Sequence, residues 1–337
     1  MRQYQFAYQD GAVVPLATEA PMPEPGRGEV RVRVEAASLN YRDLIILDQA
    51  SDGSNLGRVP LSDAAGRIDT IGPDVAAWQV GERVTIGFFR DWIRGPFRSR
   101  YMQSAFGGRT MDGLLAEYVV VPADALVRVP AGFSAEQAAT LPCAAVTAWH
   151  GLVVRAGLGA GDTLLIQGTG GVALFALQFA TTVGATAIIL SSSDEKLAKA
   201  RNLGASGLVN YRTTPDWNRA VREQTGGDGV SHILELGGPD TYTRSLNSLA
   251  AGGRIVQIGV LTGFGPKPDL GPLQSLNADI IGVTVGSVEH FRTMTAFIKT
   301  HGILPIIDRV FGFEDVAAAY SYLRTGQHFG KIVVRLL

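Results

Sequence analysis

Cysteine is nearly absent from this sequence of 337 residues, and neither sign of charge is in excess. The one cysteine, Cys143, cannot form a disulfide within the chain or build a four-cysteine zinc site. The 30 basic residues balance 31 acidic ones, so no net field attracts nucleic acid or an anionic membrane. We therefore expect a reducing compartment, the cytoplasm, and a small molecule as partner, with no nucleic acid and no membrane.

Long apolar runs, internal repeats and low-complexity tracts are also missing. The first residues, MRQYQFAYQDGAVV, have neither the basic start nor the apolar stretch of a secretory signal. Glycine and polar residues interrupt every apolar window before the roughly 18 residues of a membrane-spanning helix. A hydrophobic fraction of 46% with 18% charged residues is typical of a folded globular protein. The length predicts two domains.

The two halves of the chain differ in pattern. Residues 29–36 alternate valine with charged residues, the period of a half-buried strand, and further strands are predicted at 67–71, 83–88 and 116–122. From about residue 134 helical patterns alternate with short apolar runs, which indicates βαβ units and a parallel sheet. These runs are residues 163–167, 186–190, 208–210, 231–235, 254–258 and 280–285.

The last fifty residues predict a helix at 288–300, a strand at 306–311, a helix at 313–323 and a strand at 331–335. This tail extends the second domain or returns to the first. Residues 90–109 contain five arginines among aromatic side chains. They are expected to form a long loop, which either acts as a lid or is solvated with a few packed aromatics.

A glycine turn follows the apolar run TLLIQ and precedes the apolar helix LFALQFA. Gly168 permits a tight turn, Gly170 lets the backbone approach a pyrophosphate, and Ala173 allows close packing of helix on strand. The free N–H groups at the helix start, around Gly171 and Val172, would bind phosphate oxygens. Strand, turn and helix in this order predict a dinucleotide site.

The residues after the next strand decide between the two dinucleotides. That strand, TAIIL, ends at Ser191 and Ser192, which place no negative charge against a 2′-phosphate, so NADPH is favoured. Lys196, Tyr211 and Arg212 could supply cations and a hydroxyl to this phosphate.

The alternative gives Asp194 the role of binding the ribose and makes NAD the cofactor. Asp194 lies three residues past the strand end, however, and suits the first turn of a helix in which Ser192 and Glu195 could form a capping box.

Several ordered motifs resemble the medium-chain dehydrogenase/reductase superfamily, and within it the zinc-free, quinone oxidoreductase-like branch. They are PEPGRGEVRVRVEAASLNYRD, AAGRIDTIGPDVAAWQVGERV, AEYVVVPADALVRVPAGFSAEQAATLPCAAVTAW, the glycine turn, GASGLVNYR and HFGKIVVRL. The resemblance implies an α/β protein in which a Rossmann domain, a doubly wound parallel sheet of residues 145–285, is inserted in a β-rich GroES-like catalytic domain of residues 1–144 and 286–337.

The same resemblance argues against a metal. Zinc members of the superfamily have a cysteine where Asn40 stands and a histidine-glutamate pair where Ser62 and Asp63 stand. Cys143 falls where they supply a further ligand, but one thiolate with neighbouring aspartates does not build a three-ligand catalytic site. We expect no bound zinc.

The resemblance also implies cofactor contacts by Thr147 and by the backbone near residues 258–260 and 283–285. The remaining predicted cofactor contacts are Gly237, Ile258, Gly259, Val260, Val283, Val285, Gly330 and Lys331.

Without a metal, a side chain must stabilise the charge that hydride transfer leaves on the acceptor oxygen. The predicted catalytic residues are Asn40, which offers an amide N–H, Tyr41, which offers a phenolic proton or only packs in the core, and Asp43, which orients its neighbours. Hydride addition to a quinone or an α,β-unsaturated carbonyl needs only modest oxyanion stabilisation and is therefore favoured.

Two alternatives remain, an NAD(P)-dependent alcohol or aldehyde dehydrogenase and a dinucleotide-binding sensor or structural protein without turnover. The apolar run 280–285 is expected at the edge of the parallel sheet, which predicts a homodimer.

Overall fold

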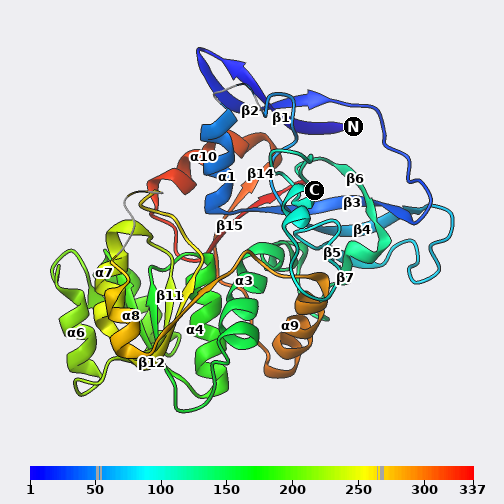
Figure 1. Cartoon of the computed structure of the whole chain (residues 1–337). Helices are drawn as coiled ribbons and strands as arrows, with labels where there is room; N and C mark the ends of the chain where they lie inside the picture. The colour runs from blue at the N-terminus through cyan, green and yellow to red at the C-terminus, as the bar shows by residue number, and fades with distance from the viewer. Residues whose placement is uncertain (51–52, 54, 264, 266–268) are drawn as a thin grey trace. The chain divides into compact units, whose positions relative to one another are not determined.

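The computed structural model describes residues 1–50, 53, 55–263, 265 and 269–337. The chain divides into two compact units, unit 1 with Met1–Val146 and Gly286–Leu337, and unit 2 with Thr147–Val285 (Figure 1). The division lies two residues after the boundary at 144/145 that the sequence predicts. The alternative that the last fifty residues extend the second domain is therefore wrong, because they join unit 1.

Unit 1 is built on a seven-stranded sheet in the order β14-β15-β3-β4-β5-β7, with β6 also paired to β3. A separate hairpin, β1 (Arg2–Gln9) with β2 (Ala12–Glu19), precedes it. The strands of the sheet are β3 (Glu29–Leu39), β4 (Asp63–Ile71), β5 (Arg83–Ile86), β6 (Tyr118–Pro122), β7 (Leu126–Arg128), β14 (Ile307–Gly312) and β15 (Lys331–Arg335).

The core of unit 1 forms because β3 alternates as its sequence predicts. Val30, Val32 and Val34 are fully buried, while the intervening residues are more exposed. The helices of unit 1 are α1 (Tyr41–Gln49), α2 (Ala135–Ala139), α9 (Val288–His301) and α10 (Val316–Thr325). Its shorter helical turns are η2 (Ser99–Ser104), η3 (Ala123–Ala125), η4 (Leu141–Ala145) and η6 (Phe313–Asp315).

Unit 2 is a parallel six-stranded sheet in the order β10-β9-β8-β11-β12-β13. This order reverses between β8 and β11, which is where a doubly wound sheet binds its ligand, outside the carboxyl ends of the strands. The strands are β8 (Thr163–Gln167), β9 (Thr186–Ser191), β10 (Gly207–Asn210), β11 (Val230–Glu235), β12 (Leu249–Gln257) and β13 (Asp279–Gly282).

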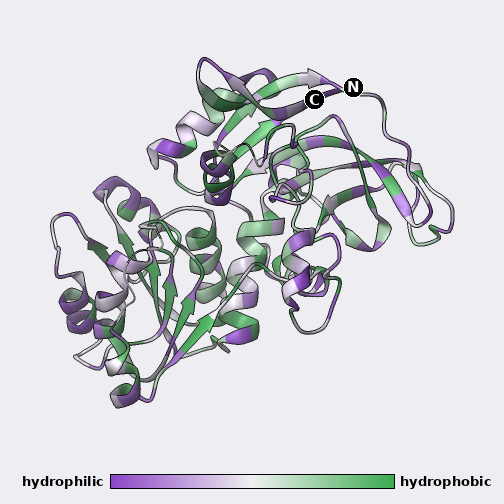
Figure 2. Cartoon of the chain, turned by 45° about the horizontal axis from the view of Figure 1, so that its top comes forward, coloured by the Kyte–Doolittle hydropathy of each residue, from purple (hydrophilic) through white to green (hydrophobic). Residues whose placement is uncertain are grey.

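Helices cover both faces of this sheet (Figure 1). On one face α6 packs on β10, and α7 and α8 pack on β11 and β12, around Trp217, Tyr242 and Leu246. On the other face α4 packs on β8 and β9. The strands between are coloured mainly as hydrophobic in Figure 2, as expected for strands buried on both faces. The helices are α3 (Val146–Ala148), η5 (Trp149–Arg155), α4 (Gly171–Val183), α5 (Asp194–Asn202), α6 (Trp217–Gln224), α7 (Pro239–Ser248) and α8 (Gly271–Leu276).

One predicted strand is too long. Residues 280–285 were expected to be extended throughout, but β13 ends at Gly282. Val285 has a φ of 49°, which a strand cannot contain and which a β-branched residue seldom adopts. Among the described helices, none has the length and apolarity that a membrane crossing requires.

Candidate functional site

A buried polar cluster in unit 1 surrounds Asn40. Because β15 pairs antiparallel with β3, Lys331 at the start of β15 lies beside the end of β3. Its ammonium donates to the backbone oxygen of Leu39 and to Oδ1 of Asn40, both at 2.6 Å, and the side chain is only 3% exposed. The family resemblance implies that Lys331 contacts the cofactor, whereas its ammonium is directed at Asn40.

Asp63 completes the cluster from the neighbouring strand. It pairs with Ser38 of β3 and is fully buried. Its carboxylate accepts hydrogen bonds from Nδ2 of Asn40 and from the Ser62 hydroxyl, both at 2.9 Å, and lies 3.8 Å from the Lys331 ammonium. Burial raises the pKa of Asp63, and the charge of Lys331 opposes that rise.

The cluster fixes the orientation of the Asn40 amide. Its oxygen accepts from Lys331, and one of its two N–H groups donates to Asp63. The second N–H of a primary amide remains able to donate to another oxygen. Asn40 itself is half-buried, immediately before α1. It can therefore present a donor in one fixed direction.

The two other predicted catalytic residues differ in position. Asp43 is buried, and its carboxylate accepts from the backbone N–H of Asn40 at 2.7 Å, a contact that holds the backbone of that residue. Burial raises the pKa of Asp43 to about 6, and the nearby Arg42 opposes that rise. Tyr41 is 42% exposed at the start of α1, so the alternative that it only packs in the core is wrong.

The side chains at this position do not fit a zinc ion. The ammonium of Lys331 already lies at the position where a metal cation would contact Asn40 and Asp63. Burial, reinforced by the charge of Asp63, raises the pKa of Cys143 well above its usual range, so the thiolate that zinc requires is disfavoured. Within the described ranges, no group of three or more His, Cys, Asp or Glu side chains is placed to hold a metal ion.

The arginine-rich segment 90–109 is anchored by its aromatic residues. Trp92 is 1% exposed, with its ring parallel to that of Tyr101 and in edge contact with that of Phe97. Arg42, two residues after Asn40, also contacts this segment. Its guanidinium donates a hydrogen bond to the backbone oxygen of Phe106 at 3.2 Å. Of the two predictions for this segment, a lid and a solvated loop with a few packed aromatic residues, these contacts agree with the second.

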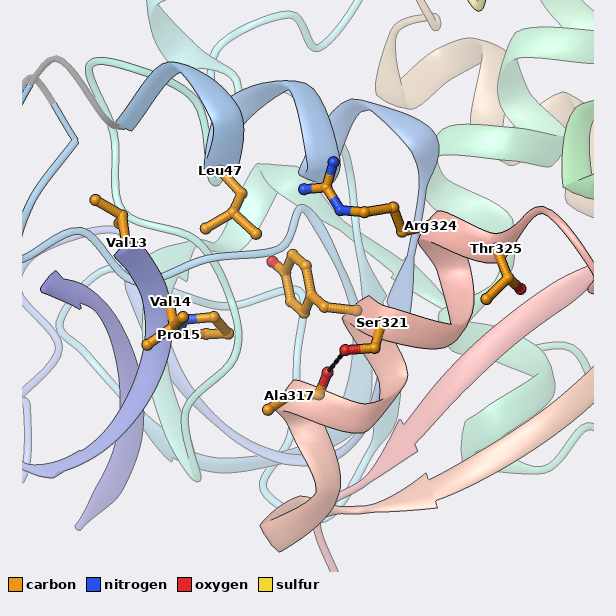
Figure 3. A pocket seen from close by; sticks show the side chains of 9 residues that line it. Val13, Val14, Pro15, Leu47, Ala317, Ser321, Arg324 and Thr325 are labelled. Carbon is orange, nitrogen blue, oxygen red and sulfur yellow. Dashed lines mark hydrogen bonds between the residues drawn. The ribbon is translucent and has the colours of Figure 1, made fainter. Parts of the chain in front are cut away.

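A pocket of about 470 Å³ in unit 1 lies between β2, α1 and α10 (Figure 3). Its walls are mainly apolar, and Arg324 at its edge is paired with Asp48 at 2.5 Å. None of its lining residues is a predicted site residue; they are Val13, Val14, Pro15, Leu47, Ala317, Tyr320, Ser321, Arg324 and Thr325.

The glycine turn of unit 2 has the geometry that its sequence predicts. Gly168 has a φ of 81°, a conformation that favours glycine, and its N–H donates to Leu190 at the end of β9. Gly170 is the N-cap of α4, whose first residues are Gly171 and Val172. The first N–H groups of such a helix have no intrahelical partner and can bind an anion.

The residues predicted to bind the adenosine end lie at the carboxyl ends of β9 and β10. Ser191 pairs with Asn210 across these strands, and Tyr211 follows directly. Asn210 donates to the Asp194 carboxylate at 2.8 Å, so Asp194 is engaged at the start of α5. The expected capping box of Ser192 and Glu195 is wrong, since the N-cap is Ser193, whose hydroxyl accepts from the Lys196 N–H.

The contacts implied by the family resemblance occupy tight positions. Thr147 is 2% exposed in α3. A Cβ on Gly330 would lie 2.3 Å from the Ile306 oxygen, and one on Gly259 would lie 2.0 Å from the Leu236 oxygen, so both positions require glycine. Ile258 and Val260, which flank Gly259 after β12, and Val283, which follows β13, are half-buried.

Val285 is held by a residue that sequence reasoning did not select. His150 Nδ1 lies 2.6 Å from the Val285 backbone oxygen, and His150 is 5% exposed. The carbonyl of Val285 is therefore engaged within unit 2. Sequence reasoning also missed Gln167 and Glu235, because a buried glutamate in an apolar run has no local pattern that marks its partners.

Comparison with known families agrees with this architecture. Residues 26–131 match the alcohol dehydrogenase GroES-like domain, and residues 171–300 match the zinc-binding dehydrogenase family. A zinc-type alcohol dehydrogenase-like protein of Schizosaccharomyces pombe is 43% identical over 92% of this chain and 91% of its own length.

Solved structures extend the comparison. A protein from Sinorhizobium meliloti has 38% identity and a TM-score of 0.91 over 99% of this chain and 98% of its own. An NAD-dependent alcohol dehydrogenase has 30% identity and a TM-score of 0.90 over the whole of both chains.

Two relatives of lower identity have names of a reductase and of a quinone oxidoreductase-like protein. A crotonyl-CoA reductase of Streptomyces avermitilis is 29% identical over 95% of this chain and 81% of its own length. A quinone oxidoreductase-like protein of Nematostella vectensis is 26% identical over 92% and 82%.

Proposed function

The chain belongs to the medium-chain dehydrogenase/reductase superfamily of oxidoreductases, and from that premise we propose that it transfers a hydride from NADPH to a quinone or an α,β-unsaturated carbonyl without a metal ion. Unit 2 would bind the dinucleotide through the glycine turn. Unit 1 would supply the donor to the acceptor oxygen.

The observation that carries this proposal is the fixed amide of Asn40 between Lys331 and Asp63. As hydride arrives at carbon, negative charge develops on the substrate oxygen, and a preorganised donor stabilises it without reorganisation. The Lys331 ammonium withdraws electron density through the Asn40 oxygen, which strengthens the remaining N–H as a donor. The cluster thereby takes over the electrostatic task that zinc performs in other members.

The preference for NADPH rests on the end of β9. Ser191 and Ser192 carry no charge, and the nearest carboxylate on α5, Asp194, is bound by Asn210. The chain offers Lys196 and Arg212 in the same region as cations for a 2′-phosphate. NAD remains the alternative, because a structural relative is NAD-dependent.

The chemistry of the cluster favours reduction of an electron-poor carbon over alcohol oxidation. Oxidation would require a base that removes the alcohol proton near pH 7. Asp63 is already occupied by Asn40 and Ser62, and Asp43 accepts from a backbone N–H. A crotonyl-CoA reductase among the relatives has a name of this kind, while the more similar relatives have alcohol dehydrogenase names, so the choice rests on the cluster.

The edge strand β13 supports a homodimer as the second part of the proposal. Ile280 and Ile281 are half-buried on β13, which is the edge strand of the sheet formed by the described residues and could pair with that of a second copy. Sedimentation analysis of the wild type and of Ile281→Lys tests this, because an edge lysine opposes pairing. A monomeric wild type would contradict it.

The function is tested by NADPH oxidation with matched quinones, enones, saturated aldehydes and alcohols. We expect turnover with the first two classes and a lower KM for NADPH than for NADH. Activity confined to alcohols would favour the alcohol dehydrogenase alternative. Tight NADPH binding without turnover on any acceptor would favour a binding protein.

A further inference from the structure

Unit 2 buries one carboxylate that none of the predicted cofactor contacts explains. Glu235, the last residue of β11, is 0% exposed. Its Oε1 accepts hydrogen bonds from the N–H groups of Gly237 and Gly238 at 3.0 and 2.9 Å and from the Thr241 hydroxyl at 2.5 Å. Its Oε2 accepts from the amide of Gln167 at 2.7 Å and from the Ser245 hydroxyl at 2.5 Å.

Gln167 connects this carboxylate to the glycine turn. It is the last residue of β8, directly before Gly168, and β8 and β11 are neighbours in the sheet. Its Oε1 accepts from the N–H groups of Leu236 and Gly237 at 3.0 and 2.9 Å. The two side chains therefore hold the loop after β11 from both sides.

The backbone of Glu235 extends the same arrangement to β12. Its carbonyl oxygen accepts from the N–H groups of both Ile258 and Gly259 at 3.1 Å. Glu235 and Gln167 thus join the carboxyl ends of β8, β11 and β12, at the place where the strand order reverses.

A buried charge is tolerated only when its oxygens are fully hydrogen-bonded. The donors to Glu235 are backbone N–H groups, hydroxyls and an amide, and charge-assisted bonds of this kind are short and directional. Because they come from the loop itself, the loop has little freedom to move.

We propose that Glu235 and Gln167 are positioning residues that hold the loops after β8, β11 and β12 in the shape that receives the dinucleotide, and that they thereby set its affinity. This inference rests on the proposed dinucleotide site of unit 2. It does not depend on which substrate is reduced.

An exchange of the two side chains tests the inference, since an amide and a carboxylate have the same shape. In Glu235→Gln the new amide meets a donor in either orientation: its NH2 group faces the Gln167 amide N–H when its oxygen stays on Gly237 and Gly238, and it faces those two N–H groups when the amide is turned over. In Gln167→Glu two carboxylates face each other. In the double variant Q167E/E235Q, the amide of residue 235 donates to the carboxylate of residue 167, and every backbone donor again meets an oxygen.

We expect each single variant to weaken NADPH binding at least tenfold, and the double variant to return within about threefold of the wild type. Dissociation constants are measured by fluorescence titration at a temperature where circular dichroism shows all proteins folded. Ser231→Ala is the matched control, because Ser231 bonds to Thr163 and Asp162 at the opposite end of β11. It should lower the melting temperature and leave the dissociation constant unchanged.

The inference would be overturned if the single variants had the same dissociation constant for NADPH as Ser231→Ala. It would also be overturned if the double variant bound NADPH no more tightly than Glu235→Gln. If Glu235→Gln does not fold, Thr241→Val removes one donor instead and should weaken binding several-fold, with unchanged affinity as the contrary result. A wild type that binds neither NADPH nor NADH contradicts the proposed function and this inference together. A wild type that binds NADPH but reduces no quinone or enone contradicts only the function.

Discussion

The ammonium of Lys331 donates a hydrogen bond to the side-chain oxygen of Asn40 at 2.6 Å, although 291 residues separate the two in the chain. The contact exists because β15 pairs with β3 and brings the start of one strand to the end of the other. It places a buried cation directly behind the amide that we propose as the oxyanion donor.

Replacing Asn40 by alanine removes that donor. We expect kcat for the best quinone or enone to fall by about 10²-fold, in the range seen for loss of one oxyanion donor. The dissociation constant of NADPH should stay unchanged. Asn202→Ala, on the exposed end of α5, is the control. An Asn40→Ala enzyme with wild-type kcat would remove Asn40 from the catalytic group.

Lys331→Met leaves the Asp63 carboxylate buried without its cation. Breaking a buried pair in this way typically costs about 3–5 kcal/mol, so the urea midpoint should fall markedly. The double variant K331M/D63N removes both charges and should regain part of the loss. Lys299→Met, on an exposed position of α9, should change little. Equal midpoints for Lys331→Met and Lys299→Met would contradict a stabilising pair.

Lys196→Glu tests the choice of cofactor. A carboxylate in this position repels a 2′-phosphate, so the KM for NADPH should rise at least tenfold while that for NADH changes less than threefold. Lys199→Glu, one turn further along α5, reverses the charge of a lysine already paired with Glu195. It should affect both cofactors weakly, and equal effects of Lys196→Glu on both would refute the phosphate role.

The buried carboxyl of Asp43 gives stability a defined pH dependence. Its pKa is raised to about 6 from an ordinary 3.8, so between these values the folded protein retains a proton that the unfolded chain has lost. The contribution of Asp43 is therefore complete below pH 3.8 and is lost as the pH rises through 6. The free energy of unfolding of Asp43→Asn, relative to that of the wild type, should therefore increase by on the order of 3 kcal/mol between pH 4 and pH 7. Urea unfolding across this range measures it, and a constant difference would contradict the shift.

Metal analysis of the purified protein tests whether the polar cluster around Asn40 binds zinc. Because an ammonium occupies the position between Asn40 and Asp63, purified protein should contain far less than one zinc per chain. Prolonged dialysis against a chelator should leave both kcat and the melting temperature unchanged. Stoichiometric zinc that is lost together with activity would refute metal-free catalysis.

Elements with a strong local period could be predicted from the sequence. β8 and β15 begin and end where the apolar runs indicated, and β3 only extends three residues further. The hairpin β1–β2 and helix α1 were missed, since Arg2–Gln9 mixes polar and aromatic residues and α1 is only nine residues long.

The glycine turn could be predicted because each residue acts through its own backbone. The partners of Lys331, His150 and Glu235 could not, since each lies on an element distant in the chain. The family resemblance implies a cofactor contact for Lys331, and only the pairing of β15 with β3 shows where its charge is directed. Side-chain networks of this kind depend on the tertiary fold.

The place of β15 between β14 and β3 in the unit 1 sheet also orders the steps of folding during synthesis. Residues 331–335 fill the gap between β14 and β3, yet they leave the ribosome after all of unit 2 has been made. Unit 2 is continuous in the chain and can fold as soon as residue 285 emerges, whereas the sheet begun at β3 waits for β15, the strand that joins β3 to the edge strand β14. The first domain to be started is therefore the last to be completed, and Asn40 acquires its cation only at that final step.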